Sequence, residues 1–171
     1  MRTQKVVLGV ASTWDRRKGL DDFVKLRTMM TDEYAIVLVG LNDKQIAALP
    51  EGVIGIKRTE SVDQLAELYS LADVFVNPTY VDNFPTTNIE ALACGTPVVT
   101  YRTGGSPEAI DEKTGVVVNQ GETNLLLPAV ENLAKNKLSY TKACRERSVE
   151  CFNKQDRFND YVELFDNLIK K

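Results

Sequence analysis

Short apolar runs separated by polar segments recur along most of this chain. The runs are rich in valine and isoleucine and show no alternation of polar and apolar positions. Such continuous runs are typical of strands that are buried on both faces of a parallel sheet. The pattern predicts six of these strands, at residues 5–11, 34–39, 53–56, 73–78, 97–100 and 114–118.

Apolar residues at helical spacing fill the segments between these runs. Ser61 is a residue type that caps helix N-termini, and Ser106 followed by Pro107 is a typical helix start. The apolar residues of segment 159–169 are spaced for one face of a helix. The predicted helices cover 21–30, 43–49, 62–71, a segment that opens near Thr86 or Thr87, a segment from Ser106, and residues from about 123 to the end.

Strands that alternate with helices through short loops imply right-handed crossovers and a parallel sheet covered on both faces. We therefore expect residues 1–171 to form one α/β domain, a doubly wound, Rossmann-like sheet of about six strands with a helical C-terminus. The expected strand order is 3-2-1-4-5-6, in which ligands bind beyond the carboxyl ends of the first and fourth strands. The loops that follow these strands, 12–19 and 78–87, are the most polar loops of the chain.

Composition narrows the classes of function. With 43% hydrophobic and 26% charged residues, the 171-residue chain has the balance of a globular protein, and its net charge of −3 argues against a nucleic-acid partner. No signal peptide and no membrane-spanning run is visible. The three cysteines lack metal-like spacing, so we expect free thiols in a reducing compartment and a cytoplasmic location.

The stretch 81–99 carries the most specific chemistry. A polar loop leaves the fourth strand and enters a helix, whose first backbone N–H groups favour a phosphate or another anion. Two carboxylates, Asp82 and Glu90, flank this loop eight positions apart. Downstream, the chain reads Glu90-Ala91-Leu92-Ala93-Cys94-Gly95-Thr96-Pro97-Val98-Val99 and then Gly104-Gly105-Ser106-Pro107-Glu108.

These residues resemble the donor-binding motif of retaining GT-B glycosyltransferases of family 4, the glycosyl transferases group 1. Members of that family carry a Glu-x7-Glu pair, so Asp82 stands here where glutamate is usual, which leaves the donor sugar open. The resemblance covers nearly the whole chain as the C-terminal half of such an enzyme. It implies that Glu90 holds the ribose and that Asp82 faces the transferred sugar. The loop residues that would line the diphosphate are Asn83, Phe84, Pro85, Thr86 and Thr87.

The first polar loop adds cations to this site. Lys18 before Gly19 matches the family's diphosphate clamp, and the resemblance makes Lys18 and Asp82 the catalytic pair. The family's early arginine is missing, and Ser12 or Thr13 occupies its place, so that Thr13 is a further candidate for donor binding. Arg17 or Arg16 is the candidate replacement, because a guanidinium binds phosphate through two parallel hydrogen bonds. A solvated basic loop is the alternative for these arginines.

Each candidate has a structural alternative. Thr87-x-x-Glu90 has the spacing of a capping box, and Asp82 could serve turn amides. Trp14 would either stack on a ligand or lie buried in the core, and the pair Lys57-Arg58 would border the base. The turn Gly104-Gly105 would allow close backbone approach near the donor or form the tight entry to a helix.

The resemblance implies a function for the whole enzyme. It would transfer a sugar from a UDP- or GDP-sugar to a glycan or lipid-linked acceptor in polysaccharide biosynthesis, at the inner face of the membrane. The N-terminal acceptor-binding half has no counterpart here, and this chain has no histidine, so the domain alone is expected to bind donor without turnover. We expect no metal requirement, since no Asp-x-Asp pair is present. The alternatives are a stand-alone nucleotide- or phosphate-binding module and half of a nucleotide-sugar epimerase.

Overall fold

Six parallel strands form one sheet in the order β3-β2-β1-β4-β5-β6 in the computed structural model, which describes residues 4–169. The predicted order is confirmed, and each strand lies within two residues of its predicted bounds. The reversal of order places β1 and β4 side by side at the centre of the sheet. The strands are β1 (Lys5–Val10), β2 (Tyr34–Val39), β3 (Val53–Ile56), β4 (Val74–Asn77), β5 (Val98–Tyr101) and β6 (Gly115–Val118).

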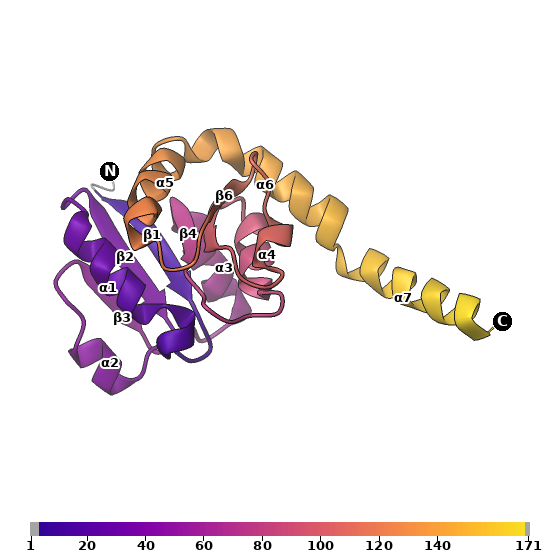
Figure 1. Cartoon of the computed structure of the whole chain (residues 1–171), viewed down its shortest axis with the longest axis horizontal. Helices are drawn as coiled ribbons and strands as arrows, with labels where there is room; N and C mark the ends of the chain where they lie inside the picture. Colours follow the sequence, from indigo (N-terminus) through magenta and orange to yellow (C-terminus); the bar gives the residue numbers. More distant parts are fainter. Residues whose placement is uncertain (1–3, 170–171) are drawn as a thin grey trace.

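Helices cover both faces of this sheet (Figure 1). Alternate strand residues point to opposite faces, and this divides the interior into two cores. One core packs the sheet against α1 (Leu20–Met29), α2 (Asp43–Ala47) and α5 (Thr123–Lys135). The other packs it against α3 (Val62–Leu71), α4 (Thr86–Ala93) and α6 (Lys137–Phe152).

Local signals set several helix ends. The Ser61 hydroxyl accepts a hydrogen bond from the Gln64 amide at 3.1 Å, which confirms the predicted cap of α3. The predicted helix from Ser106 is wrong in two respects. It is a short 3₁₀ helix, η2 (Ser106–Ala109), and its N-cap is Gly105. Ser106 does not act as the cap because its hydroxyl is used in buried hydrogen bonds with other side chains.

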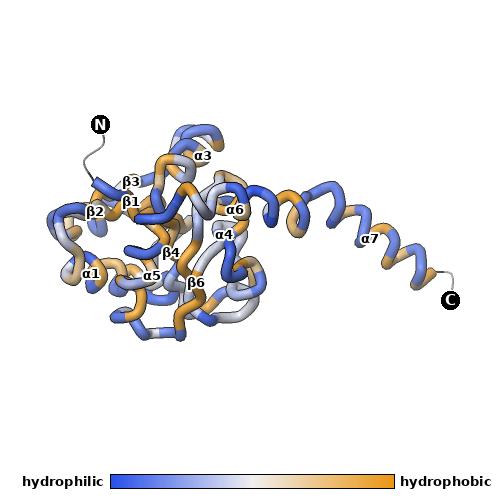
Figure 2. The backbone as a smooth tube through the Cα atoms, turned by 90° about the horizontal axis from the view of Figure 1, so that it is seen from above, coloured by the Kyte–Doolittle hydropathy of each residue, from blue (hydrophilic) through white to orange (hydrophobic). Residues whose placement is uncertain are grey.

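The C-terminal helical segment is divided into three helices, with breaks at Asn136 and Asn153. The last of them, α7 (Lys154–Ile169), has no buried residue and leads away from the domain (Figures 1 and 2). Residues 170 and 171, to which the prediction also extended, lie outside the described part. The side chains that share one face of α7 are 51% to 81% exposed: Phe158, Tyr161, Val162, Leu164, Phe165, Leu168 and Ile169.

No helix within residues 4–169 has both the length and the apolar character needed to cross a membrane.

Candidate functional site

A cavity of about 370 Å³ opens where β1 and β4 end, at the edge of the sheet that the strand order predicts for a ligand. Residues of the β1 loop form one wall, and the segment from the end of β4 into α4 forms the other. The lining residues are Val10, Ala11, Ser12, Lys18, Asn77, Asp82, Phe84, Pro85, Thr86, Thr87 and Glu90.

Gly19 brings the β1 loop against the end of β4. Its φ of +74° lies in the left-handed region, and a Cβ atom there would sit 2.2 Å from the Pro78 carbonyl oxygen. Only glycine fits that position without strain. The contact is reinforced by the Tyr80 amide, which donates to the Arg17 carbonyl at 2.6 Å. Lys18, which lies between these two anchors, is thereby placed at the cavity.

Lys18 and Asp82 form an ion pair inside the cavity. The Lys18 ammonium donates to Asp82 Oδ2 at 2.6 Å, although the two residues are 64 positions apart in the sequence. Within residues 4–169, no backbone amide donates to the Asp82 carboxylate, so the turn-amide alternative is wrong. The structure thus brings together the two residues that the sequence predicts as the catalytic pair.

The glycine pair after β5 supports the loop that carries Asp82. A Cβ atom on Gly104 would lie 2.0 Å from the Asp82 carbonyl oxygen, and one on Gly105 would lie 2.7 Å from the Phe84 ring. The Gly105 amide also donates to the Asn83 carbonyl at 2.7 Å. These glycines thus allow close backbone approach to the loop that carries Asp82, and Gly105 also forms the entry to η2 as its N-cap.

Glu90 reaches the cavity from α4 and is not part of a capping box. The helix begins at Thr86 with Pro85 as its N-cap, so Thr87 already lies inside the first turn and caps nothing. The Glu90 carboxylate instead accepts hydrogen bonds from the Tyr69 hydroxyl at 2.9 Å and from the Thr86 hydroxyl at 3.2 Å. The N-terminus of α4, where Thr86 and Thr87 line the cavity, carries the positive end of the helix dipole, which gives this wall partial positive charge.

A buried polar network fixes the start of α4, and sequence reasoning missed it. Asn88, fully buried in the first turn of α4, accepts from the Asn77 side chain at 2.9 Å and donates to the Ser106 hydroxyl at 3.0 Å. That hydroxyl lies 2.6 Å from Thr100 Oγ1. The available signal was the polar Asn77 and Thr100 at the ends of otherwise apolar strands.

Three predicted donor-binding residues do not line the cavity. Arg17 is 64% exposed and bonds twice to the Asp15 carboxylate, at 2.8 and 3.0 Å. This pairing lowers the pKa of Asp15 and raises that of Arg17. Thr13 is exposed, and Ser12 lines the cavity in its place. Asn83 contributes its carbonyl to the loop, as described above.

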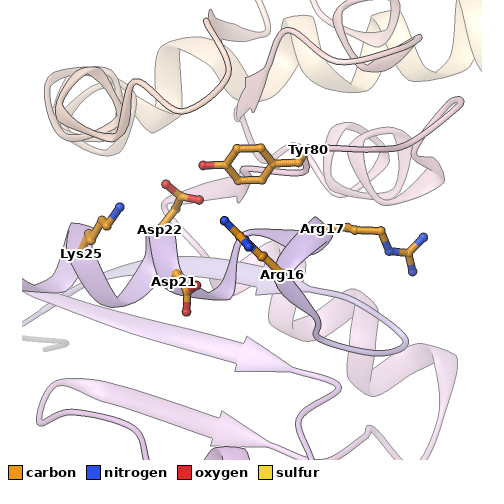
Figure 3. A pocket seen from close by; sticks show the side chains of 6 residues that line it. All are labelled: Arg16, Arg17, Asp21, Asp22, Lys25 and Tyr80. Atoms are coloured by element: carbon orange, nitrogen blue, oxygen red, sulfur yellow. The ribbon is translucent and has the colours of Figure 1, made fainter.

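Arg17 belongs instead to a second cavity, of about 350 Å³, beside the start of α1 (Figure 3). Its guanidinium points away from the other five labelled side chains. One of them, Asp22, is buried and accepts hydrogen bonds from the Tyr101 hydroxyl at 3.0 Å and the Thr123 hydroxyl at 2.5 Å. The expectation that Arg17 or Arg16 replaces the missing arginine at the donor cavity has no support in this arrangement.

Trp14 and Lys57 are not among the residues that line the donor cavity. Trp14 is buried, packs edge-on against Phe23 and donates its indole N–H to the Val39 carbonyl at 2.8 Å, as its core alternative predicts. Lys57 pairs with Asp43 at 2.5 Å on the surface. All three cysteines are free thiols. No group of three or more metal-ligating side chains occurs within residues 4–169.

Comparison of the sequence with known protein families identifies the family of this chain. The family model for glycosyl transferases group 1 matches residues 4–136. The chain belongs to this family. This group 1 chain is 31% identical over 132 residues to D-inositol 3-phosphate glycosyltransferase of Mycobacteroides abscessus, a match that covers 76% of this chain and 26% of that relative.

Solved structures of larger proteins contain a domain of the same fold. Sucrose-phosphate synthase from Thermosynechococcus elongatus superimposes with a TM-score of 0.86 and 26% identity, over 99% of this chain and 47% of that one. The Anabaena protein HepE superimposes with a TM-score of 0.80 and 18% identity over 95% of this chain, a likeness of fold alone. The group 1 chain thus has the fold of a GT-B glycosyltransferase domain and spans about half the length of these structures.

Proposed function

We propose that this chain is the donor-binding half of a retaining glycosyltransferase and that its cavity holds a nucleotide-diphosphate sugar. The observation that carries the proposal is the meeting of one cation, two carboxylates and an open helix N-terminus in a single cavity. These groups are Lys18, Asp82, Glu90 and the first turn of α4.

The basic side of this cavity suits a diphosphate. The first amides of α4 present hydrogen-bond donors and the positive end of the helix dipole. Lys18 adds a full positive charge beside them. When the sugar leaves, negative charge develops on the diphosphate, and fixed donors aimed at that charge lower the barrier. These groups give the diphosphate its binding site and make it a better leaving group.

The acidic side suits hydroxyl groups. A carboxylate accepts two neighbouring hydroxyl donors well, and we assign the ribose to Glu90 and the transferred sugar to Asp82. The cavity joins both carboxylates to the phosphate-binding wall, as a nucleotide sugar requires. The structural neighbour HepE was solved in complex with UDP-glucose, which supports a donor of this class.

Transfer of the sugar requires an acceptor site, and we propose that this domain does not supply that site by itself. The chain spans about half the length of its structural neighbours. We therefore assign acceptor binding to a second half, with a glycan or lipid-linked acceptor and a role in polysaccharide biosynthesis. Lys18 and the helix amides can balance the diphosphate charge, so we propose that donor binding needs no divalent cation.

Calorimetric titration with UDP, GDP and ADP, each with and without an attached sugar, tests the proposal. We expect at least one nucleotide to bind, and Lys18→Met to weaken it about tenfold through loss of a charge-assisted contact. Lys25→Met is the matched control, because Lys25 lines only the second cavity and its loss should leave affinity unchanged. The proposal fails if no nucleotide binds at millimolar concentration or if the two lysine variants behave alike. Affinity that EDTA abolishes and magnesium restores would contradict metal independence.

A further inference from the structure

Tyr69 touches the donor cavity only through Glu90. Its side chain, on α3, is 1% exposed, and its hydroxyl donates to Glu90 Oε2 at 2.9 Å. The ring packs edge-on against Phe75 of β4 with 5.4 Å between centroids. Its backbone carbonyl accepts from the Thr96 hydroxyl at 2.6 Å. Both the ring and the backbone of this tyrosine are therefore held in place from behind the cavity.

The Glu90 carboxylate is held by neutral donors only. Tyr69 donates to Oε2, Thr86 donates to Oε1, and no lysine or arginine within residues 4–169 forms an ion pair with this carboxylate. An ionised carboxylate offers about four acceptor positions, two on each oxygen. One position on each oxygen is occupied by the protein. One position on each oxygen is thus left for a ligand in the cavity that Glu90 lines.

We infer that Tyr69 is a positioning residue, which holds the Glu90 carboxylate so that its two oxygens receive the two neighbouring hydroxyls of a ribose. The inference rests on the proposed function, because it assigns the ribose to Glu90. Two adjacent hydroxyls can each donate to one carboxylate oxygen, and this matches the two positions left open. Without the fixed hydroxyl of Tyr69, the carboxylate would lose the shorter and better buried of the two contacts that set its rotation about the last side-chain bond.

The chemistry of Tyr69 fits this role. Burial, and then the neighbouring Glu90 carboxylate, raise the pKa of the Tyr69 hydroxyl above its ordinary value. The hydroxyl therefore stays protonated throughout the range in which the protein would work, and it remains a donor. A phenylalanine would keep the packing on Phe75 and remove only this donor, which makes Tyr69→Phe the informative variant.

The experiment compares each of UDP, GDP and ADP with its 2′-deoxy analogue by calorimetry. In the wild-type chain we expect the 2′-deoxy analogue to bind about tenfold more weakly, the loss of one hydrogen bond to a charged acceptor. In Tyr69→Phe we expect this ratio to shrink to about twofold, because the carboxylate is no longer aligned. Tyr101→Phe is the matched control, since that buried hydroxyl also donates to a carboxylate, Asp22, which does not line the donor cavity.

The possible outcomes separate the inference from the proposed function. A wild-type chain that binds none of the six nucleotides overturns the proposed function and the ribose assignment with it. A chain that binds them, with the 2′-hydroxyl ratio the same in Tyr69→Phe as in wild type, overturns only the role of Tyr69. A fall in overall affinity with an unchanged ratio would show a merely structural tyrosine. If the affinity ratio between the nucleotide and its 2′-deoxy analogue also shrinks in Tyr101→Phe, the effect comes from a general loss of rigidity in the fold, and the role of Tyr69 is overturned.

Discussion

Replacing Asp82 by asparagine tests how the ion pair between Lys18 and Asp82 affects stability and nucleotide binding. In the free chain the Lys18 ammonium is held by Asp82 at 2.6 Å, so an incoming diphosphate must compete for that ammonium. Asparagine keeps the size and one acceptor oxygen but removes the charge. The variant therefore loses the pair and also loses the negative charge nearest to the diphosphate.

The structure bounds the size of the effect. Two unit charges 2.6 Å apart attract by about 6 kcal/mol at an effective dielectric constant of about 20, and the cost of desolvating them offsets most of this. Exposed pairs contribute about 0.2–1 kcal/mol, whereas breaking a buried pair costs about 3–5 kcal/mol. Lys18 and Asp82 are 28% and 17% exposed, so we expect a coupling of about 1–2 kcal/mol.

Two assays measure this expectation. Urea unfolding of wild type, Asp82→Asn, Lys18→Met and the double variant should give that coupling as a double-mutant cycle. Asp43→Asn is the control, because its pair with Lys57 is largely exposed and should contribute less than about 1 kcal/mol. In calorimetry, Asp82→Asn should bind UDP about threefold more tightly, while the preference for UDP-sugar over UDP falls about tenfold. A loss of UDP affinity in Asp82→Asn would refute the reasoning, because it would make Asp82 a support for the phosphate site.

Three further predictions concern Gly19, Glu90 and Cys144. Gly19→Ala should cost about 3 kcal/mol of unfolding free energy in urea denaturation. Gly121→Ala should cost about 1 kcal/mol, because its φ is similarly positive but a Cβ atom there would meet only the Tyr80 hydroxyl oxygen, at 3.9 Å. Equal costs would exclude the clash with Pro78. Glu90→Gln should weaken nucleotide binding by about 1–2 kcal/mol, and normal binding in calorimetry would remove Glu90 from the site. Burial, and then the nearby Asp111 carboxylate, raise the pKa of the Cys144 thiol to about 12. A thiol reagent at pH 8 should therefore label the exposed Cys151 in the native protein and label Cys144 only after urea is added. Rapid labelling of both cysteines in the native protein would contradict this.

The strands were predictable because each is a largely continuous apolar run, as is typical of a sheet buried on both faces. The bounds and caps of the helices were less predictable, because the spacing of their apolar residues does not specify where each helix ends. The segment after residue 123 has helical composition throughout, so its sequence predicts one continuous helical region, whereas the structure divides it at Asn136 and Asn153. Ser106 had the right neighbours for a helix cap, but a buried network with Asn88 and Thr100 uses its hydroxyl instead.

The cavity was predictable because the reversal of strand order and the acidic pair indicate the same edge. What the sequence could not specify was which side chains of a polar loop point inward. Arg17 and Lys18 are adjacent cations, yet the nearby Asp15 engages the first, and the second reaches across to Asp82. Tyr69 was equally hidden, because a tyrosine among the apolar residues of a helix is most simply interpreted as core.

Helix α7 differs thermodynamically from the rest of the molecule. It has 16 residues, none of them buried, and local contacts such as the Arg157–Asp160 pair at 2.9 Å contribute only tenths of a kcal/mol. A helix of this length is near the limit of stability in water, so its helicity follows a helix–coil equilibrium and not the cooperative unfolding of the domain. Its amides should exchange with solvent far faster than those of α3 or α4. A surface that covered its apolar face would order the helix in the same step as it bound it, with a negative heat-capacity change as the signature of that event.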